Sequence, residues 1–317
     1  MTFSRSPRSE ARLARSVVLV ALLVLNACGG DGDGGGDTPP SAPPVPSPAL
    51  VGVASGASPV AAGCTCVASG APAPGGINFA NAEVEPFAAV HPGNPNLRLA
   101  AWQQDRWSNG GARALVSAVS SDGGINWSRM LHPMSRCGGA GMGMPGDFEG
   151  ASDPWVDIGP GGALLAGSAS AMLHSRSIDD DRTWSTPTVL ASDGTGFFHD
   201  KNTLTADPLD ARLVYAVWDR LNTRNNGPTL LARSTDGGAR WEPARVICTP
   251  APATGAGSSQ TIGNRIVVRT AGPARGVLVN VFLQIDTVAG NQTSRVAVQR
   301  SANRGLTCTA AAPGPRL

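Results

Sequence analysis

The sequence predicts an all-β fold made of repeated four-stranded antiparallel units. Glycine and proline are frequent, with 40 Gly and 26 Pro among the 317 residues, whereas charged residues make up only 15%. This composition disfavours long helices and favours many short strands joined by turns. An eight-residue motif also recurs along the chain at nearly even spacing. Such spacing is typical of repeat folds.

The recurring motif, called the octet below, begins with a serine in every copy. The first copy reads Ser-Ser-Asp-Gly-Gly-Ile-Asn-Trp, and the next two keep its Ser-x-Asp start and its final tryptophan. The third residues of the copies, Asp122, Asp179, Asp236 and Asn303, are 57, 57 and 67 residues apart, and the fourth copy ends in Cys308. The other matching positions are Ser120, Gly124, Trp127, Ser177, Trp184, Ser234, Gly238, Trp241, Ser301 and Gly305.

The octet has the chemistry of a turn between two strands. Its serine and aspartate oxygens can accept hydrogen bonds from backbone N–H groups, and its glycines adopt positive φ without a steric penalty. The copies follow apolar runs at residues 112–120, 170–177, 228–234 and 294–301. We therefore expect each octet to join the third and fourth strands of a unit, with its tryptophan packed into the core.

Two further strands are predicted before each octet. The pairs are residues 85–90 with 99–102, 153–158 with 163–170, 200–205 with 214–218, and 264–268 with 277–282. Each pair surrounds a turn rich in Gly, Asn or Pro. Trp102, Trp218 and Phe282 fall at matching positions and are expected to be core residues. Four antiparallel strands per unit make one blade of a β-propeller.

The octet resembles the Asp-box, or BNR repeat, of sialidase-like β-propellers. This resemblance implies that residues 76–317 form such a propeller, with about four blades present. We expect an incomplete six-bladed ring that is truncated at its C-terminal end. Cys308 replaces the last tryptophan, and the ending TAAAPGPRL no longer resembles a strand. Asp-boxes are structural turns, so they indicate the fold rather than an activity.

Strand direction predicts which polar side chains lie together. In an antiparallel blade the start of the first strand and the end of the second strand lie at the same end, opposite the octet. The carboxylates expected there, Glu85, Asp153 and Asp200, are the candidate catalytic groups. The candidate substrate-binding residues are Gln104, Arg106, Lys201, Asp219, Arg220 and Arg265. The alternative is that these groups only cap strand ends and pair with one another.

The resemblance also implies a catalytic set that the sequence matches poorly. Sialidases use three arginines, a tyrosine nucleophile assisted by a glutamate, and an aspartic acid as acid/base. No Phe- or Tyr-Arg-Ile-Pro motif is present, and the single tyrosine, Tyr215, lies within an apolar strand where it is expected to pack. Two functions remain open: a sialidase-like glycoside hydrolase, now incomplete, or a non-catalytic propeller that binds glycans or proteins. No cofactor is expected.

The N-terminus predicts export. Four arginines precede the apolar run at residues 17–25, which is shorter than the roughly 20 residues of a membrane-spanning helix. Residues 1–27 therefore read as a signal peptide, and residues 25–29 resemble the bacterial lipobox, which implies lipidation of Cys28. The Gly/Pro-rich residues 28–75 are expected to be a linker. The expected location is the bacterial cell envelope through a lipid anchor, with plain secretion as the alternative.

The cysteine count limits the possible disulfides, and the net charge limits the possible partners. Cys64, Cys66, Cys137, Cys248 and Cys308 are an odd number for an exported chain, so one stays unpaired or the chain is incomplete, and their pairing stays open. The Cys-x-Cys pair lacks a histidine cluster, and no metal is expected. The net charge is +2, with four arginines in the signal peptide. A nearly neutral mature chain argues against nucleic acid as a partner and leaves a glycan or a cell-surface protein.

Overall fold

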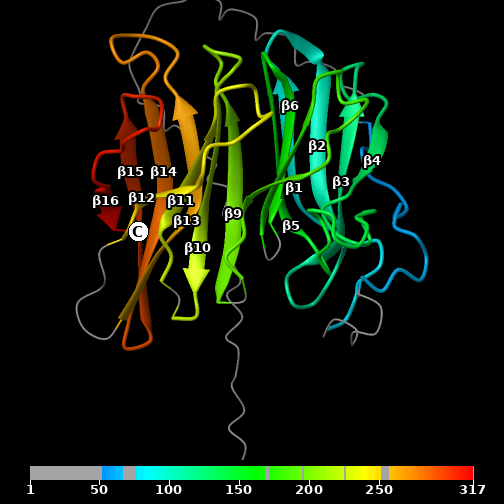
Figure 1. Cartoon of the computed structure of the whole chain (residues 1–317), viewed down its shortest axis with the longest axis horizontal. Helices are drawn as coiled ribbons and strands as arrows, with labels where there is room; N and C mark the ends of the chain where they lie inside the picture. Colours follow the sequence, from blue (N-terminus) through cyan, green and yellow to red (C-terminus); the bar gives the residue numbers. More distant parts are fainter. Residues whose placement is uncertain are drawn as a thin grey trace, which may run out of the picture. The chain divides into compact units, whose positions relative to one another are not determined.

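The described part of the chain is all β. The computed structural model describes residues 52–66, 76–168, 171–194, 196–224, 226–250 and 257–316, and its sixteen strands form four four-stranded antiparallel sheets (Figure 1). Within these ranges no helix is long and apolar enough to cross a membrane. The signal peptide expected at residues 1–27 and Cys28 lie outside the described residues.

Each sheet takes four consecutive strands in chain order. Sheet 1 consists of β1 (Glu83–His91), β2 (Asn94–Arg106), β3 (Ala112–Ser120) and β4 (Ser128–His132). Sheet 2 consists of β5 (Ser152–Gly159), β6 (Gly162–Ser168), β7 (Met172–Ser177) and β8 (Thr188–Ala191). Sheet 3 consists of β9 (Phe197–Ala206), β10 (Val214–Asn222), β11 (Thr229–Ser234) and β12 (Arg245–Cys248). Sheet 4 consists of β13 (Gly257–Val268), β14 (Leu278–Val288), β15 (Asn291–Ser301) and β16 (Ala312–Arg316).

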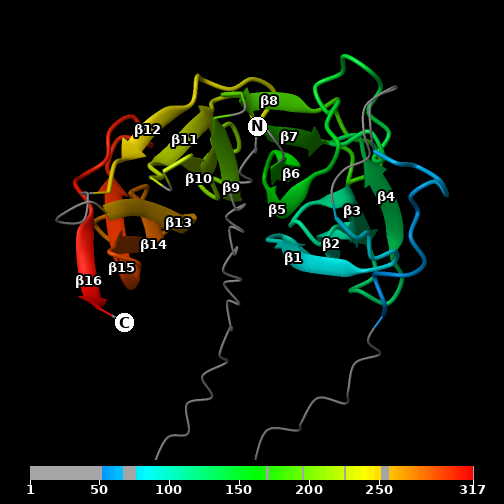
Figure 2. The same ribbon diagram turned by 90° about the horizontal axis from the view of Figure 1, so that it is seen from below.

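The sheets are arranged as the blades of a β-propeller. Neighbouring sheets contact each other in chain order, through β1 with β5, β5 with β9 and β9 with β13. In Figure 2 the first strands of the sheets lie on the inner side of the row and the fourth strands on the outer side. The predicted fold class is confirmed, and the described strands form an open row of blades.

The last blade corrects one expectation. The ending was expected not to form a strand, but β16 pairs with β15 through Val298 and Ala312 and through Ala297 and Pro313. Proline cannot donate a ladder hydrogen bond, yet it is tolerated in a strand that pairs on only one side. β16 is such an edge strand.

The core lies between the blades. One apolar cluster joins sheets 1 and 2 through residues such as Leu99 and Val156, and a second joins sheets 2 and 3 around Leu164 and Trp218. A third joins sheets 3 and 4 and includes Tyr215. Aliphatic and aromatic side chains on facing strands thereby bury each other, which is the main stabilising term of such a fold.

The tryptophans divide into two groups. Trp102, Trp218 and Phe282 are 4%, 0% and 2% exposed, which confirms their prediction as core residues. The octet residues Trp184 and Trp241 are only half-buried, although both pack against the preceding sheet. Octet tryptophans therefore cover the edge of the core and are not central to it.

The octets form the predicted turns between third and fourth strands. In the first, Ser120 Oγ donates to Asp122 Oδ1 at 2.8 Å and accepts the Gly124 N–H at 2.8 Å. Asp122 Oδ1 also accepts the Asn126 N–H at 2.9 Å. The serine accepts the matching N–H in the other copies at 3.0, 2.8 and 2.8 Å. The fifth octet position has positive φ in all four copies.

The second octet carries an aspartate where the other three have glycine. Asp181 has a φ of 65°, is 4% exposed, and its carboxylate oxygens have no hydrogen-bond partner among the described residues. Burial, with help from Asp180 and Asp179, raises the pKa of Asp181 to about 7. Both the backbone conformation and the buried carboxyl group are unfavourable.

We expect Asp181→Gly to raise the free energy of unfolding by about 1 to 2 kcal/mol, because it removes backbone strain and a buried carboxyl group. A raised pKa in the folded state means that wild-type stability falls as pH rises from about 4 to about 7. The gain should therefore be larger at pH 8 than at pH 5, as urea denaturation would measure. The reciprocal control, Gly238→Asp, should destabilise, since its Cβ would lie 3.1 Å from His174. A less stable Asp181→Gly protein would contradict this interpretation.

Residues 52–66 lie against sheet 1, although the sequence assigns them to the linker. Val60 and Cys66 are 9% and 2% exposed and share a cluster with Cys137. Ser58 Oγ donates to Asp105 Oδ2 at 2.9 Å, and Arg129 Nη1 donates to a backbone carbonyl of this segment at 2.8 Å. The segment thus covers part of the outer face of the first blade.

Candidate functional site

Every first strand contains a bulge at the same place. In β1, β5, β9 and β13 two residues oppose one residue of the second strand, and the first bulged residue has positive φ. These residues are Glu85 (52°), Asp153 (51°), Lys201 (46°) and Gly263 (65°). Residues other than glycine rarely adopt this backbone conformation. Bulges and strained residues are frequent beside functional sites. Three neighbouring blades therefore hold a charged side chain in a strained conformation at matching positions.

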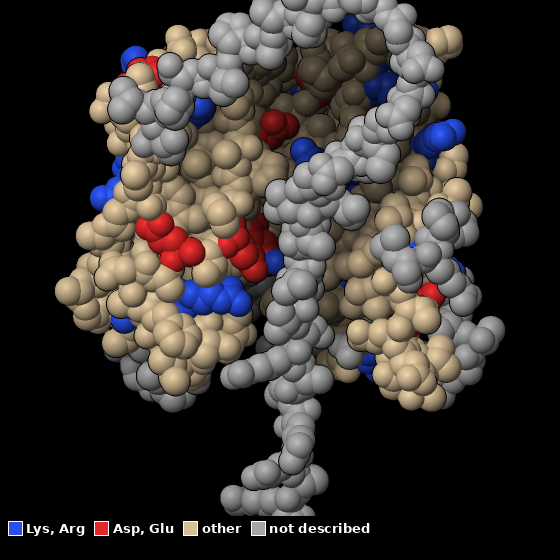
Figure 3. Space-filling model, turned by 180° about the vertical axis from the view of Figure 1, so that it is seen from behind, with Lys and Arg blue, Asp and Glu red and all other residues tan. Residues whose placement is uncertain are grey.

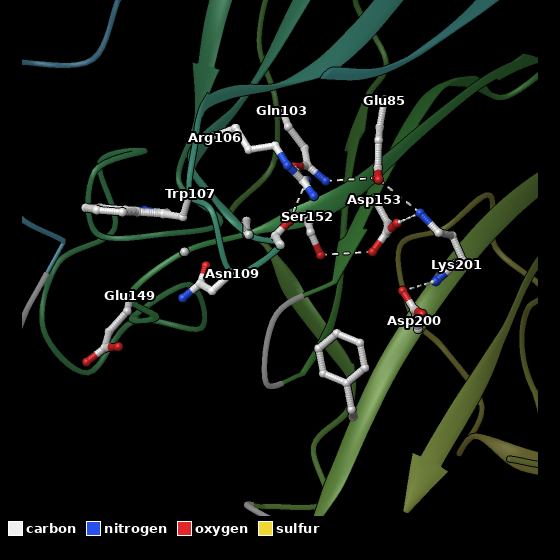
Figure 4. Close-up of a pocket in the computed structure, with 15 residues that line it drawn as sticks. Glu85, Gln103, Arg106, Trp107, Asn109, Glu149, Ser152, Asp153, Asp200 and Lys201 are labelled. Carbon is white, nitrogen blue, oxygen red and sulfur yellow. Dashed lines mark hydrogen bonds and ion pairs between the residues drawn. The ribbon is translucent and has the colours of Figure 1, made fainter. Parts of the chain in front are cut away.

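These charged side chains point toward one another (Figure 4). Lys201 Nζ donates to Asp153 Oδ1 at 2.6 Å and to Glu85 Oε1 at 3.1 Å. Asp200 lies beside them and accepts the Lys201 backbone N–H at 3.0 Å. We call Glu85, Asp153, Asp200 and Lys201 the bulge cluster. The three carboxylates that strand direction predicts at the end of the blades opposite the octets lie together there.

Two neutral side chains orient the carboxylates of the bulge cluster. Gln103 Nε2 donates to Glu85 Oε2 at 2.9 Å, and Ser152 Oγ donates to Asp153 Oδ2 at 2.9 Å. Gln103 in turn accepts a hydrogen bond from Arg106 Nη1 at 2.9 Å. Charge-assisted hydrogen bonds of this kind fix side-chain orientation.

The carboxyl groups differ in charge. Burial alone would raise the pKa of Asp153, but the Lys201 ammonium holds it below the usual value. Burial and the neighbouring Asp153 raise the pKa of Glu85, and the same causes raise that of Asp200 to about 7. The site therefore holds an ionised carboxylate beside a carboxyl group that can carry a proton near neutral pH.

A cavity of about 450 Å³ opens on the bulge cluster between sheets 1, 2 and 3. Arg106, Trp107 and Glu149 extend its lining away from the cluster (Figure 4). The lining combines acids, a lysine, an arginine and the aromatic rings of Trp107 and Phe198. A pocket with a few convergent polar groups and shifted pKa values is the expected form of a ligand site.

A second cavity of about 380 Å³ shares three members of the cluster and continues toward sheet 4. There the rings of Phe87 and Trp155 stack with centroids 3.4 Å apart, and the Arg265 guanidinium lies 5.3 Å from the Trp155 ring. Both rings belong to first strands and come directly after the two bulged residues. The bulge cluster thus lies between a polar cavity and an aromatic one.

Three predicted binding residues lie in the cavities and three do not. Arg106 and Lys201 line the first cavity, and Arg265 lines the second. Arg220 instead pairs with Asp193 at 3.1 Å and lies over the Phe197 ring, outside both cavities.

Gln104 and Asp219 are fully buried. Gln104 accepts the Trp102 indole N–H at 3.0 Å, and so supports the core. Burial, together with Asp200, raises the pKa of Asp219 well above its usual value. Side chains alternate along a strand, so Gln103 faces the cavity and its neighbour does not. Ser152, Trp107, Glu149 and the Phe87–Trp155 stack were not predicted.

The catalytic set implied by the sialidase resemblance is not assembled among the described residues. Arg106, Arg220 and Arg265 lie in three different surroundings and do not converge. Tyr215 is fully buried and its hydroxyl donates to Asp207 Oδ2 at 3.2 Å, which confirms its prediction as a packing residue.

On the face shown in Figure 3, Lys and Arg lie among Asp and Glu on a largely uncharged surface.

We expect Asp200→Asn to remove a pH-dependent loss of stability. Because the folded-state pKa of Asp200 is raised to about 7, wild-type stability should fall between about pH 4 and pH 7, where this carboxyl group is ionised in the unfolded chain but still protonated in the folded protein. The variant should lack this part of the fall, as urea denaturation at several pH values would measure. Asp210→Asn is the control, since that carboxyl group pairs with Arg212 and has a lowered pKa. Identical pH profiles for wild type and Asp200→Asn would contradict the assignment.

Comparison with known proteins finds similarity to this chain in structure only. No family model and no curated protein matches the sequence. A solved α-L-arabinofuranosidase of Fusarium graminearum, in complex with an iminosugar inhibitor, has a TM-score of 0.48 and 13% identity, covering 75% of this chain and 73% of that chain. A Hadza microbial sialidase has a TM-score of 0.41 and 13% identity, covering 75% and 60%.

Proposed function

We propose that this chain is an exported surface lipoprotein whose propeller binds glycans at the bulge cluster. The observation that carries the proposal is the group of charged side chains held at strained bulge positions in three neighbouring blades. Carboxylates accept hydrogen bonds from sugar hydroxyls, and ammonium and guanidinium groups donate to them. Aromatic rings such as those of Phe87 and Trp155 offer apolar surface for the C–H faces of a sugar.

Export and anchoring are proposed from the N-terminal sequence, with Cys28 as the lipidated residue. The octets are proposed to be Asp-box repeats with a structural role, which agrees with their turn hydrogen bonds. Membrane fractionation of a Cys28→Ser protein tests the anchor. Release into the soluble fraction is expected, and continued membrane attachment would contradict lipidation at Cys28.

Glycoside hydrolysis is a second candidate, favoured by one observation. Asp200, with a pKa near 7, lies beside the ionised Asp153, and glycosidases pair a protonated acid with a carboxylate. Sialosides are poor candidate substrates, because the three arginines do not converge and Tyr215 is in the core. A cell-surface protein remains the alternative ligand.

A glycan array with the full chain tests the proposal, together with fluorogenic sialoside and arabinofuranoside substrates. We expect glycan binding and no sialoside turnover above background. Loss of one group from a covalent mechanism already costs several powers of ten in rate. Sialoside turnover that Arg106→Ala or Asp200→Asn abolishes would contradict the prediction. The absence of any glycan ligand, with capture of a surface protein, would favour the alternative.

A further inference from the structure

Three cysteine sulfurs converge beside the first blade. Cys64 and Cys66 belong to the segment 52–66, and Cys137 belongs to the loop between β4 and β5. Their Sγ atoms all lie within 4.8 Å of one another. The Cys137 Sγ atom lies next to the Sγ atoms of both of the others. One sulfur can hold only one disulfide at a time, so Cys137 has two competing partners.

The backbone accommodates either disulfide. The Cα atoms of Cys64 and Cys137 are 5.8 Å apart, and those of Cys66 and Cys137 are 5.3 Å apart. Both separations lie within the range in which a disulfide forms without backbone movement.

Contacts other than sulfur hold the two segments in this position. Arg136 Nη1 donates to the Cys66 carbonyl at 3.2 Å, and Arg136 Nε donates to Asp147 Oδ1 at 2.5 Å. Cys66 also packs with Val60 in the apolar cluster that contains Cys137. The proximity of the three sulfurs therefore does not depend on which bond is present.

The two pairings leave different thiols. Cys66 and Cys137 are 2% and 5% exposed, whereas Cys64 is half-buried. A Cys64–Cys137 disulfide leaves a buried thiol at Cys66. A Cys66–Cys137 disulfide leaves a thiol at Cys64 that solvent can reach.

We propose that Cys64, Cys66 and Cys137 form a thiol–disulfide exchange site, in which Cys137 alternates between two partners. A small-molecule disulfide such as oxidised glutathione makes the first bond, oxidising two thiols as it is reduced to two thiols. The Cys66 thiolate then attacks Cys137 Sγ of the Cys64–Cys137 bond. The Cys66–Cys137 bond forms, and the electron pair leaves on Cys64, which takes up a proton equal to the one that Cys66 lost.

Either bond keeps the segment 52–66 attached to the loop between β4 and β5, so exchange changes the reactive thiol without releasing the segment. The form with the Cys66–Cys137 disulfide carries a free Cys64 thiol, which can react with a soluble thiol-specific reagent or with a second disulfide. This site is separate from the bulge cluster and does not depend on the proposed function.

Thiol mapping of the full chain after equilibration with oxidised and reduced glutathione tests the proposal. Samples are quenched in acid, unfolded, treated with N-ethylmaleimide and mapped by fragmentation mass spectrometry. We expect each molecule to carry one N-ethylmaleimide label among Cys64, Cys66 and Cys137. The label should lie on Cys64 in some molecules and on Cys66 in the rest. Label on the same cysteine in every molecule, or on all three, would overturn the proposal.

A time course on the native protein distinguishes exchange from a fixed mixture. As N-ethylmaleimide traps the exposed Cys64 thiol, exchange should convert the remaining molecules until nearly all carry label at Cys64. A plateau at the initial fraction would overturn exchange. Cys64→Ser and Cys66→Ser should each keep a reducible link to Cys137, and the loss of that link in either folded variant would also overturn it. Cys248→Ser is the matched control and should change none of these results.

Discussion

Replacing Trp218 by alanine is expected to lower the free energy of unfolding by about 3 to 5 kcal/mol, the usual range for removing a large buried aromatic side chain. Trp218 is fully buried in the cluster between sheets 2 and 3. Its indole N–H donates to His199 Nδ1 at 2.9 Å, and it lies opposite the bulge that positions Lys201. The loss should be measured by urea denaturation.

Trp218→Phe separates the two contributions, because phenylalanine keeps most of the apolar volume but cannot donate to His199. We expect it to lose about 1 to 2 kcal/mol. A loss below about 1 kcal/mol for Trp218→Ala would mean that the blade interface does not depend on this side chain.

Lys201→Met is expected to weaken glycan binding by at least about tenfold, since a hydrogen bond to a charged group contributes about 1.5 to 3 kcal/mol. The substitution keeps much of the side-chain volume but removes the ammonium between Asp153 and Glu85. The two carboxylates then lose their shared cation, and their orientation in the cavity changes. Calorimetric titration with the strongest ligand from the array measures the effect.

Arg220→Met is the matched control, since Arg220 lies on the adjacent strand of the same sheet but outside both cavities. The Arg220→Met protein should bind the ligand with the same affinity as the wild type. Equal affinities for Lys201→Met and the wild type would remove the bulge cluster from the binding site.

Much of the fold could be predicted from the octets. Their spacing and their turn chemistry specify the third and fourth strands, and the paired runs around turns rich in Gly, Asn or Pro predict the first two. The prediction failed at β16, because a one-sided edge strand tolerates prolines that a central strand would exclude. The burial of the octet tryptophans was overestimated because their turns lie at the ends of the blades.

The candidate site was predicted in part. Strand direction alone brought Glu85, Asp153 and Asp200 to the same end of the blades. Strand direction does not specify, however, toward which face of the sheet a side chain points. A bulge also shifts the alternation of side chains along its strand by one residue. The sequence signal for the bulges is slight, a proline after Glu85 and after Asp153 but not after Lys201. For this reason Gln104 and Arg220 were expected in the pocket, whereas the Phe87–Trp155 stack was missed. Asp219 matches Gln103 in register but is fully buried, so it does not line the pocket either.

The pairing of the cysteines had no sequence signal. Cys64 and Cys66 are 73 and 71 residues from Cys137, and their approach depends on how the segment 52–66 lies on the first blade. Spacing alone does not contain that information.

A crystal structure of this protein with its strongest array ligand tests directly whether glycans bind at the bulge cluster. We expect a sugar within hydrogen-bond distance of Glu85, Asp153 or Lys201, with a ring face toward Phe87, Trp155 or Trp107. A sugar bound on another surface, with both cavities beside the cluster unchanged, would contradict it.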